Sequence, residues 1–350
     1  DVYKRQLFNS IEGISDGLNS NCWKLNDKNK SYFLKFYKSF VSDERDRFNT
    51  ELSFLEILKK ENFEKVPRVV FSNCQEGWAL FSWIDGNKIK KANRAQWEEY
   101  LNFLIALQKL KFSKYVYQIN NASEACFSIE SHYSLIENRM ISFLSYIANK
   151  KLLSILYDWL KDEIIVELNL IKDQIFKENS LKNLKMNKKI ISPSDVGFHN
   201  VLSNSSQLYF FDFEYAGWDD VYKLFVDLII RPENIIKKET ALEIVNYLSE
   251  AINVDFEEKI FKIYLKLYRI KWILIILNSV YKNEISSAND FSKIFSKVLN
   301  IDFEPIFWPR DGFQSIPLKI ALSSFFFFIF RWTKPFFKQF GNRMFRPGTA

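Results

Sequence analysis

The pattern of apolar residues changes once along the chain, near residue 86, and this change constrains the fold most. Residues 7–86 hold short aromatic and branched runs, NCWKL and YFLKFYKS around the polar NDKNK, then VPRVVFSN and WALFSWIDG. Such runs are typical of antiparallel strands and hairpins. From about residue 94, apolar residues recur every three or four positions, as in AQWEEYLNFLIALQKL, which indicates helices. The sequence therefore predicts an α+β protein with a small, β-rich N-lobe and a larger, helical C-lobe.

We expect three parts: an N-terminal nucleotide-binding lobe over residues 7–86, a helical C-lobe over 87–285, and a C-terminal extension over 286–350 of uncertain structure. The first six residues, DVYKRQ, carry no signal-peptide pattern and resemble a translated sequencing adapter. They are left out of the fold prediction.

The C-terminal extension contains the apolar run IALSSFFFFIF, eleven residues long. A transmembrane helix needs about twenty, so no transmembrane segment is expected. With the basic, aromatic stretch that follows, the run is compatible with peripheral contact at a membrane surface. A core or partner-contact helix, or translated sequence outside the natural frame, are the alternatives.

Composition narrows the partners. Lys and Arg number 49 against 42 Asp and Glu, a net charge of +7, which favours anionic partners such as nucleotides or sugar phosphates. The excess is too diffuse to indicate a nucleic-acid partner. Three cysteines without CxxC spacing argue against a disulfide framework and a zinc site, so a reducing, cytoplasmic location fits best. Only two histidines are present, so a general base is expected to be a carboxylate.

Lys35 lies in a strand among large apolar residues, FLKFY. An ammonium group is costly to bury unless an anionic group meets it. The helix that follows has an apolar stripe from Phe48 to Leu58, with Glu51 beside it, and Glu51 is the natural partner. Alternatively, Lys35 points to solvent from an edge strand, because alternation places every second side chain on the wet face.

A second polar group follows in SPSDVGFHN, where Asp195 and Asn200 stand five residues apart in a segment containing Gly197, which indicates an irregular loop. Asp212 follows the apolar strand LYFF behind a polar turn, so a hairpin would return it over Asn200. Two oxygen ligands would then face one Mg²⁺. The alternatives are an Asx turn at the loop and a strand-end cap at Asp212.

Together these residues match a chemical requirement. Phosphoryl transfer from ATP needs a cation on the phosphates, a carboxylate that aligns the acceptor hydroxyl, and oxygen ligands for Mg²⁺. The chain also lacks GxxxxGK[ST], so a P-loop kinase is excluded.

The order Lys35, Glu51, SDVGFHN and DFEYAGWDD resembles the aminoglycoside phosphotransferase and choline kinase family. That family shares the protein-kinase fold and carries HGDxxxxN followed by (I/V)DF or (I/V)DW. The resemblance covers roughly residues 12–282, and SPSDxGFHN with DFEYxGWDD is similar to a bacterial branch associated with surface-polysaccharide loci. It implies a protein-kinase-like two-lobe fold, ATP and Mg²⁺ as cofactors, and a small-molecule hydroxyl acceptor.

The resemblance implies roles for single residues. Asp195 would be the catalytic base, Asn200 and Asp212 the Mg²⁺ ligands, and Lys35 the phosphate anchor with Glu51 as its ion-pair partner.

The resemblance also implies where the nucleotide binds. The loop DGLNSN, residues 16–21, would cover the phosphates, and it contains Gly17, which permits close backbone approach, and Asn19. A hinge whose backbone reads adenine is expected at Ser82, Trp83 and Ile84.

The chain departs from the family pattern at three positions. Pro193 and Ser194 stand where the family has His-Gly, and Gly197 stands where many members have His or Lys. These changes imply the loss of a positive group near the transferred phosphoryl group. His199 would compensate for it, or would serve as a loop-packing residue.

Three acidic residues follow the second motif and are candidates for the acceptor site: Glu214, Asp219 and Asp220. They would bind an amine or a polyol, or anchor the loop through backbone N–H groups.

The predicted function is an ATP- and Mg²⁺-dependent phosphotransferase acting on a hydroxyl of a sugar, amino sugar or amino alcohol. The alternative is a nucleotide-binding pseudokinase with a regulatory or scaffold role, which Ser194 and Gly197 motivate.

Overall fold

In the computed structural model, the described residues are 8–16, 20–38, 45–150, 153–177, 189–205, 207–231, 234, 236 and 238–281. The chain divides into two compact units, residues 1–275 and residues 276–350. Apart from the end of one helix, the described residues belong to the first unit.

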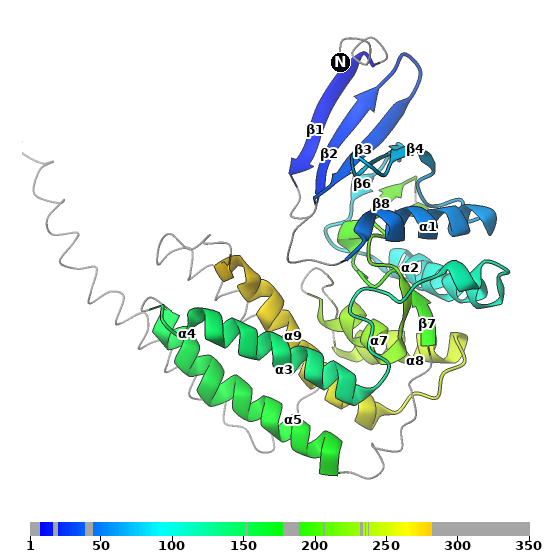
Figure 1. The fold of residues 1–350 in the computed structure, drawn as a ribbon. Coiled ribbons are helices and arrows are strands. Elements are labelled where there is room, and N and C mark those ends of the chain that lie inside the picture. The colour runs from blue at the N-terminus through cyan, green and yellow to red at the C-terminus, as the bar shows by residue number, and fades with distance from the viewer. Residues whose placement is uncertain are drawn as a thin grey trace, which may run out of the picture. The chain divides into compact units, whose positions relative to one another are not determined.

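The first unit begins with a five-stranded antiparallel sheet of order β1-β2-β3-β5-β4 (Figure 1). Its strands are β1 (Ser10–Asp16), β2 (Ser20–Asn26), β3 (Ser31–Tyr37), β4 (Val69–Asn73) and β5 (Trp78–Ser82). Lys35 lies in β3 opposite Cys22 of β2 and Ala79 of β5. It therefore stands on an interior strand, and the alternative of an edge strand is wrong.

Helix α1 (Arg47–Lys60) begins at Asp46, whose side chain accepts a hydrogen bond from the backbone N–H of Asn49 at 3.1 Å. Such a side-chain cap satisfies one of the free N–H groups of the first turn. Its buried residues are Arg47, Glu51, Phe54, Leu55, Ile57 and Leu58. The sequence predicts Glu51 beside the apolar stripe, whereas the structure places it within the buried face of α1. Its carboxylate is tolerated there because it has polar partners, which are described below.

The chain leaves the first sheet after Ser82. The next strand, β6 (Asn87–Lys88), pairs with β8 (Val201–Asn204), which pairs with β9 (Gln207–Phe210). The predicted hairpin around LYFF is confirmed. Gly86 is required here, because a Cβ at that position would lie 2.9 Å from Leu202 Cβ. The domain boundaries at 86 and 285 stay predictions.

The remainder of the first unit is mainly helical, which confirms the α+β prediction. Its helices are α2 (Arg94–Leu107), α3 (Ile129–Ile147), α4 (Ser154–Trp159), α5 (Ile165–Lys177), α7 (Val221–Ile230), α8 (Lys238–Ala251) and α9 (Glu258–Tyr281). Two short strands, β7 (Lys189–Ser192) and β10 (Gly217–Asp220), pair antiparallel. Helices α3 and α5 lie side by side (Figure 1), and the rings of Tyr133 and Phe176 meet between them at 6.2 Å.

An aromatic cluster fixes the segment between β7 and β8 to helix α2. The ring of Phe198 lies 4.8 Å from that of Trp97 and 5.0 Å from that of Tyr100. The rings of Phe103 and Phe210 stack at 3.7 Å. Because these rings bury a large apolar area, the loop that carries Asp195 is held against the core.

Some predictions fall outside the described residues. Gly17 and Asn19 of the expected phosphate loop lie there, as does the C-terminal aromatic segment. Among the helices of the described part, none has the length and apolar character needed to cross a membrane.

Candidate active site

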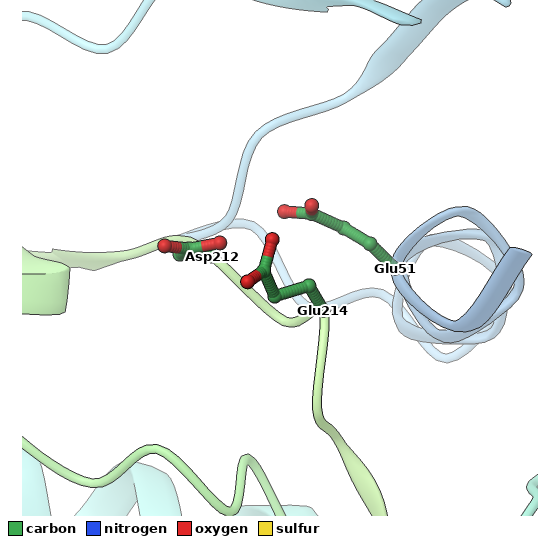
Figure 2. A group of neighbouring side chains, drawn as sticks. All are labelled: Glu51, Asp212 and Glu214. Carbon is green, nitrogen blue, oxygen red and sulfur yellow. The ribbon is translucent and has the colours of Figure 1, made fainter. Parts of the chain in front are cut away.

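Lys35 brings three carboxylates together. Its Nζ lies 2.7 Å from Glu51 Oε2, 2.6 Å from Asp212 Oδ1 and 2.9 Å from Glu214 Oε2. Figure 2 shows the three acidic side chains converging, one from helix α1 and two from the segment after β9. The predicted pairing of Lys35 with Glu51 is confirmed, and its role toward phosphates stays a prediction.

Both oxygens of Glu51 are engaged. Oε2 also accepts a hydrogen bond from Tyr37 Oη at 2.7 Å, and Oε1 accepts one from the backbone N–H of Phe213 at 3.2 Å. Asp212 differs, because 35% of its side chain is exposed, against 4% for Glu51. Asp212 is therefore the carboxylate of this pair that a ligand can reach.

Glu214 is the third carboxylate on Lys35. It is buried, 2.9 Å from Lys35 Nζ and 3.7 Å from Arg47 Nε. Arg47 in turn donates a hydrogen bond to Tyr215 Oη at 3.2 Å. Lys35 and Arg47 thus supply the cations that a buried carboxylate needs, and a role of Glu214 in acceptor binding stays a prediction.

Burial and the neighbouring charges shift the pKa values of Lys35, Glu51 and Tyr37. Burial acts to lower the pKa of Lys35, but the carboxylates of Glu51 and Asp212 raise it well above its ordinary value. Lys35 therefore remains an ammonium group. Burial raises the pKa of Glu51, and burial also raises the pKa of Tyr37, which keeps its hydroxyl as a hydrogen-bond donor.

The same carboxylates fit a divalent cation by their chemistry. Oxygen atoms of Glu51, Asp212 and Glu214 lie within 4.8 Å of one another, and carboxylate oxygens are the ligands that Mg²⁺ prefers. Lys35 contacts one oxygen of each of these three carboxylates. Asp212 is the partly exposed one, so it is best able to turn its other oxygen toward a metal.

Asp195 forms the second half of the site. Its carboxylate contacts the Arg231 guanidinium, lies 3.3 Å from His199 Nε2, and accepts a hydrogen bond from Asn200 Nδ2 at 3.1 Å. Burial acts to raise the pKa of Asp195, but the hydrogen bond with His199 and the charge of Arg231 hold it well below its usual range. Asp195 is therefore a carboxylate at neutral pH, and 21% of its side chain is exposed.

Gly197 lets His199 and Arg231 approach Asp195. A Cβ at this position would lie 2.5 Å from His199 Nδ1 and 2.9 Å from Arg231 Cδ. The absence of a side chain at Gly197 therefore leaves space for two residues that face the same carboxylate. Arg231 places a cation on Asp195, and the loss of a positive group near the transferred phosphoryl group stays a prediction.

The hairpin brings Asp212 back beside Asn200 through the backbone. The N–H of Phe211 donates to the carbonyl oxygen of Asn200 at 3.1 Å, and Val201 pairs with Phe210 in the β8–β9 register. The predicted return of the hairpin is confirmed. A Mg²⁺ ion shared by Asn200 and Asp212 stays a prediction.

The expected hinge lies between β5 and β6. The N–H of Ser82 donates to the carbonyl oxygen of Arg68 at 2.8 Å, and Ser82 Oγ accepts from the N–H of Arg68 at 2.9 Å. The Trp83 indole has Lys24 Nζ 4.4 Å from its ring centre. Adenine recognition by Ser82, Trp83 and Ile84 stays a prediction.

Asp219 and Asp220 have no exposed surface. Asp220 caps α7 by accepting hydrogen bonds from two N–H groups of its first turn, and its other oxygen lies 3.3 Å from His132 Nε2 and 2.9 Å from Tyr264 Oη. Asp219 pairs with Lys223. These contacts anchor the segment, as one of the two alternatives expected, and acceptor binding by either residue stays a prediction.

Sequence reasoning missed Arg231. It follows the last residue of α7 and meets Asp195 across 36 residues of chain. The spacing of residues in VDLIIRP does not indicate that Arg231 contacts Asp195. That contact depends on the direction of helix α7 in the folded protein.

Comparisons with known proteins agree with this fold. A family model described as "Phosphotransferase enzyme family" matches residues 10–119. No curated protein sequence matches the chain. Among solved structures, a spectinomycin phosphotransferase in complex with ADP and spectinomycin has a TM-score of 0.59 and 16% identity, covering 85% of this chain and 91% of its own.

Two further solved structures are also similar. Choline kinase from Cryptosporidium parvum Iowa II has a TM-score of 0.53 and 14% identity, with 85% of this chain and 91% of that chain covered. A choline/ethanolamine kinase family protein from Mesorhizobium loti has a TM-score of 0.54 and 14% identity, with 87% and 90% covered.

The chain has a protein-kinase-like fold, with a β-sheet N-lobe and a helical C-lobe. It is the fold found in the similar structures of a spectinomycin phosphotransferase and a choline kinase. The resemblance predicted from the motifs is thereby confirmed.

Proposed function

We propose that this chain is an ATP- and Mg²⁺-dependent phosphotransferase that phosphorylates a hydroxyl of a sugar, amino sugar or amino alcohol, in surface polysaccharide metabolism. The observation that carries the proposal is the buried Lys35, held by Glu51 and in contact with the partly exposed Asp212. Kinases use such a lysine to bind the ATP phosphates beside the metal-binding aspartate.

The structurally similar proteins support the choice of acceptor. Their names include a phosphotransferase bound to ADP and spectinomycin and two proteins of the choline kinase group. All of these names imply a small molecule, and none implies a protein or nucleic-acid acceptor.

The residues divide the work of the reaction between them. Lys35 binds the phosphates of ATP, and Glu51 fixes the direction of its side chain. Asp212 and Asn200 would hold Mg²⁺, which supplies charge neutralisation on the phosphate oxygens. The acceptor hydroxyl oxygen forms the new P–O bond as the bond to the leaving ADP breaks.

Asp195 receives the proton of the acceptor hydroxyl. Its low pKa makes it a weak base, so its main contribution is to orient the hydroxyl by accepting its hydrogen bond. Arg231 and His199 lie on the same carboxylate, and the Arg231 guanidinium places positive charge near the phosphoryl group in transit.

Nucleotide binding completes the proposal. We assign adenine recognition to the backbone of Ser82, Trp83 and Ile84, and the cover over the phosphates to the loop with Gly17 and Asn19. We place the enzyme in the cytoplasm, and the three free cysteines, Cys22, Cys74 and Cys126, support a reducing compartment.

An assay of ADP release tests the proposal. Purified protein is incubated with ATP and a panel of sugars, amino sugars, choline-like alcohols and aminoglycosides, with and without Mg²⁺. We expect Mg²⁺-dependent release stimulated by at least one class, lost in Asp195→Asn and retained in Asp173→Asn, which alters an exposed ion pair on α5.

The alternative, a pseudokinase, predicts a different result. ATP would raise the melting temperature without turnover by any acceptor. The site favours the enzyme, because Asp195 retains an exposed carboxylate edge and the positive group missing from its loop is present in Arg231.

A further inference from the structure

The residue before Asp195 has a backbone conformation that residues other than glycine rarely adopt. Ser194 has a φ of 62°, and the N–H of Asp195 donates to the carbonyl oxygen of Pro193 at 2.7 Å. This bond closes a three-residue turn centred on Ser194. The γ-turn with positive φ is rare and strained, and such strain persists only where the surroundings enforce it.

Hydrogen bonds enforce the turn at Ser194. Its N–H donates to Ser192 Oγ at 2.9 Å, and its hydroxyl donates to the carbonyl oxygen of Ser123 at 3.5 Å. The shortest contact of the hydroxyl comes from Lys223 Nζ, which donates to Ser194 Oγ at 2.7 Å. Because the other contacts are longer, Lys223 provides the strongest restraint.

Lys223 is itself fixed from behind. It belongs to the first turn of α7, is 2% exposed, and pairs with the fully buried Asp219. Burial acts to lower the pKa of Lys223, but the carboxylates of Asp219 and Asp227 raise it. The ammonium group therefore stays charged while it donates to Ser194.

We propose that Lys223 is a positioning residue for the catalytic loop. Anchored by Asp219, it binds the Ser194 hydroxyl and holds the strained turn that sets the direction of the Asp195 carboxylate. This inference rests on the proposed function, in which Asp195 receives the proton of the acceptor. A displacement of about 1 Å at such a group is enough to lower turnover by orders of magnitude.

A simpler role for Lys223 is to neutralise Asp219 in the core, and a double-mutant cycle separates the two roles. Glycine adopts a positive φ without strain, so Ser194→Gly needs no hydroxyl contact to keep the turn. Every Lys223→Met variant also carries Asp219→Asn, so that the carboxylate paired with Lys223 is not left buried without its cation.

If Lys223 acts through Ser194, the Lys223→Met, Asp219→Asn pair lowers kcat about tenfold or more when Ser194 is present, with KM for ATP unchanged. In the Ser194→Gly background the same pair costs less than about threefold. Ser194→Ala, which removes the hydroxyl and keeps the strain, should lose activity as the pair does. Equal losses of kcat in both backgrounds would overturn the inference.

Thermal unfolding of the same variants tests the role of Lys223 without any measurement of turnover. We expect Ser194→Gly to raise the melting temperature more in the Lys223→Met, Asp219→Asn background than in the wild type, because the strain is then unsupported. Equal shifts would overturn the inference. Absence of turnover in the wild type with every acceptor would contradict the proposed function, while this unfolding cycle would still decide the role of Lys223.

Discussion

Replacing Lys35 with methionine tests the fold and the site together. From the sequence alone, Lys35→Met is expected to cost far more in turnover than in folding stability, because it removes a contact with the phosphates while methionine has a side chain of similar length. The structure predicts a loss of stability as well, since the change leaves the buried carboxylates of Glu51 and Glu214 without this ammonium group. Removing one partner of a buried ion pair costs about 3–5 kcal/mol.

The remaining contacts place the cost near the lower end of that range. Glu51 keeps its hydrogen bonds from Tyr37 and Phe213, and Glu214 keeps Arg47 at 3.7 Å. A loss of about 3 kcal/mol corresponds to a fall in melting temperature of about 6–12 °C for a domain near this size. Circular dichroism or differential scanning fluorimetry at pH 8 measures it.

The pH dependence identifies the cause. Burial already raises the pKa of Glu51, and loss of Lys35 disfavours its carboxylate further. The folded variant then binds a proton that the unfolded chain does not bind at the same pH, so its stability rises as pH falls. We expect the gap in melting temperature between Lys35→Met and wild type to narrow from pH 8 to pH 5.

The double variant Lys35→Met, Glu51→Gln serves as the control. A neutral amide removes the buried charge, so we expect part of the melting temperature to return at pH 8 while turnover stays absent. A single variant that melts within about 2 °C of wild type, or a gap that does not change with pH, would refute the reasoning.

Three further outcomes are expected around the two carboxylates. Asp212→Ala should abolish turnover and weaken ATP binding mainly when Mg²⁺ is present; calorimetry that finds equal affinity with and without metal in both proteins counts against it. Arg231→Leu removes the charge that lowers the pKa of Asp195, so the acid limb of the kcat/KM profile should move to higher pH, and an unchanged profile contradicts the assignment. Gly197→Ala places a methyl group 2.5 Å from His199 Nδ1, so kcat should fall by about tenfold or more with the melting temperature little changed; wild-type kcat would show that this approach is not needed.

Two pairs of site residues, Lys35 with Glu51 and Asn200 with Asp212, could be predicted from the sequence because the members of each pair are close along the chain. A lysine in an apolar strand and a glutamate in the helix after it are joined by one short connection, and an apolar stripe orients that helix. The hairpin between Asn200 and Asp212 is likewise local. In both cases strand and helix periodicity fixes which side chains share a face.

Glu214 could not be placed in the same way. It stands two positions after the predicted metal ligand Asp212, yet its side chain turns to Lys35 and Arg47. Burial of Arg47 at the start of α1 is what makes this direction favourable, and a charged residue at a helix start is ordinarily predicted to be exposed. The three-dimensional meeting of the two lobes decides the outcome.

Helix α7 explains why the departures at Ser194 and Gly197 do not leave the site incomplete. Its first turn carries Lys223, which binds the Ser194 hydroxyl, and Arg231 follows its last residue and binds Asp195. Helix α7 therefore contacts the Asp195 loop from both of its ends. Since the two contacts fall on the central residue and the last residue of the γ-turn, a change in the direction of α7 would move the turn and the Asp195 carboxylate together. The buried cap at Asp220, which fixes the start of α7 through His132 and Tyr264, then belongs to the support of the Asp195 carboxylate.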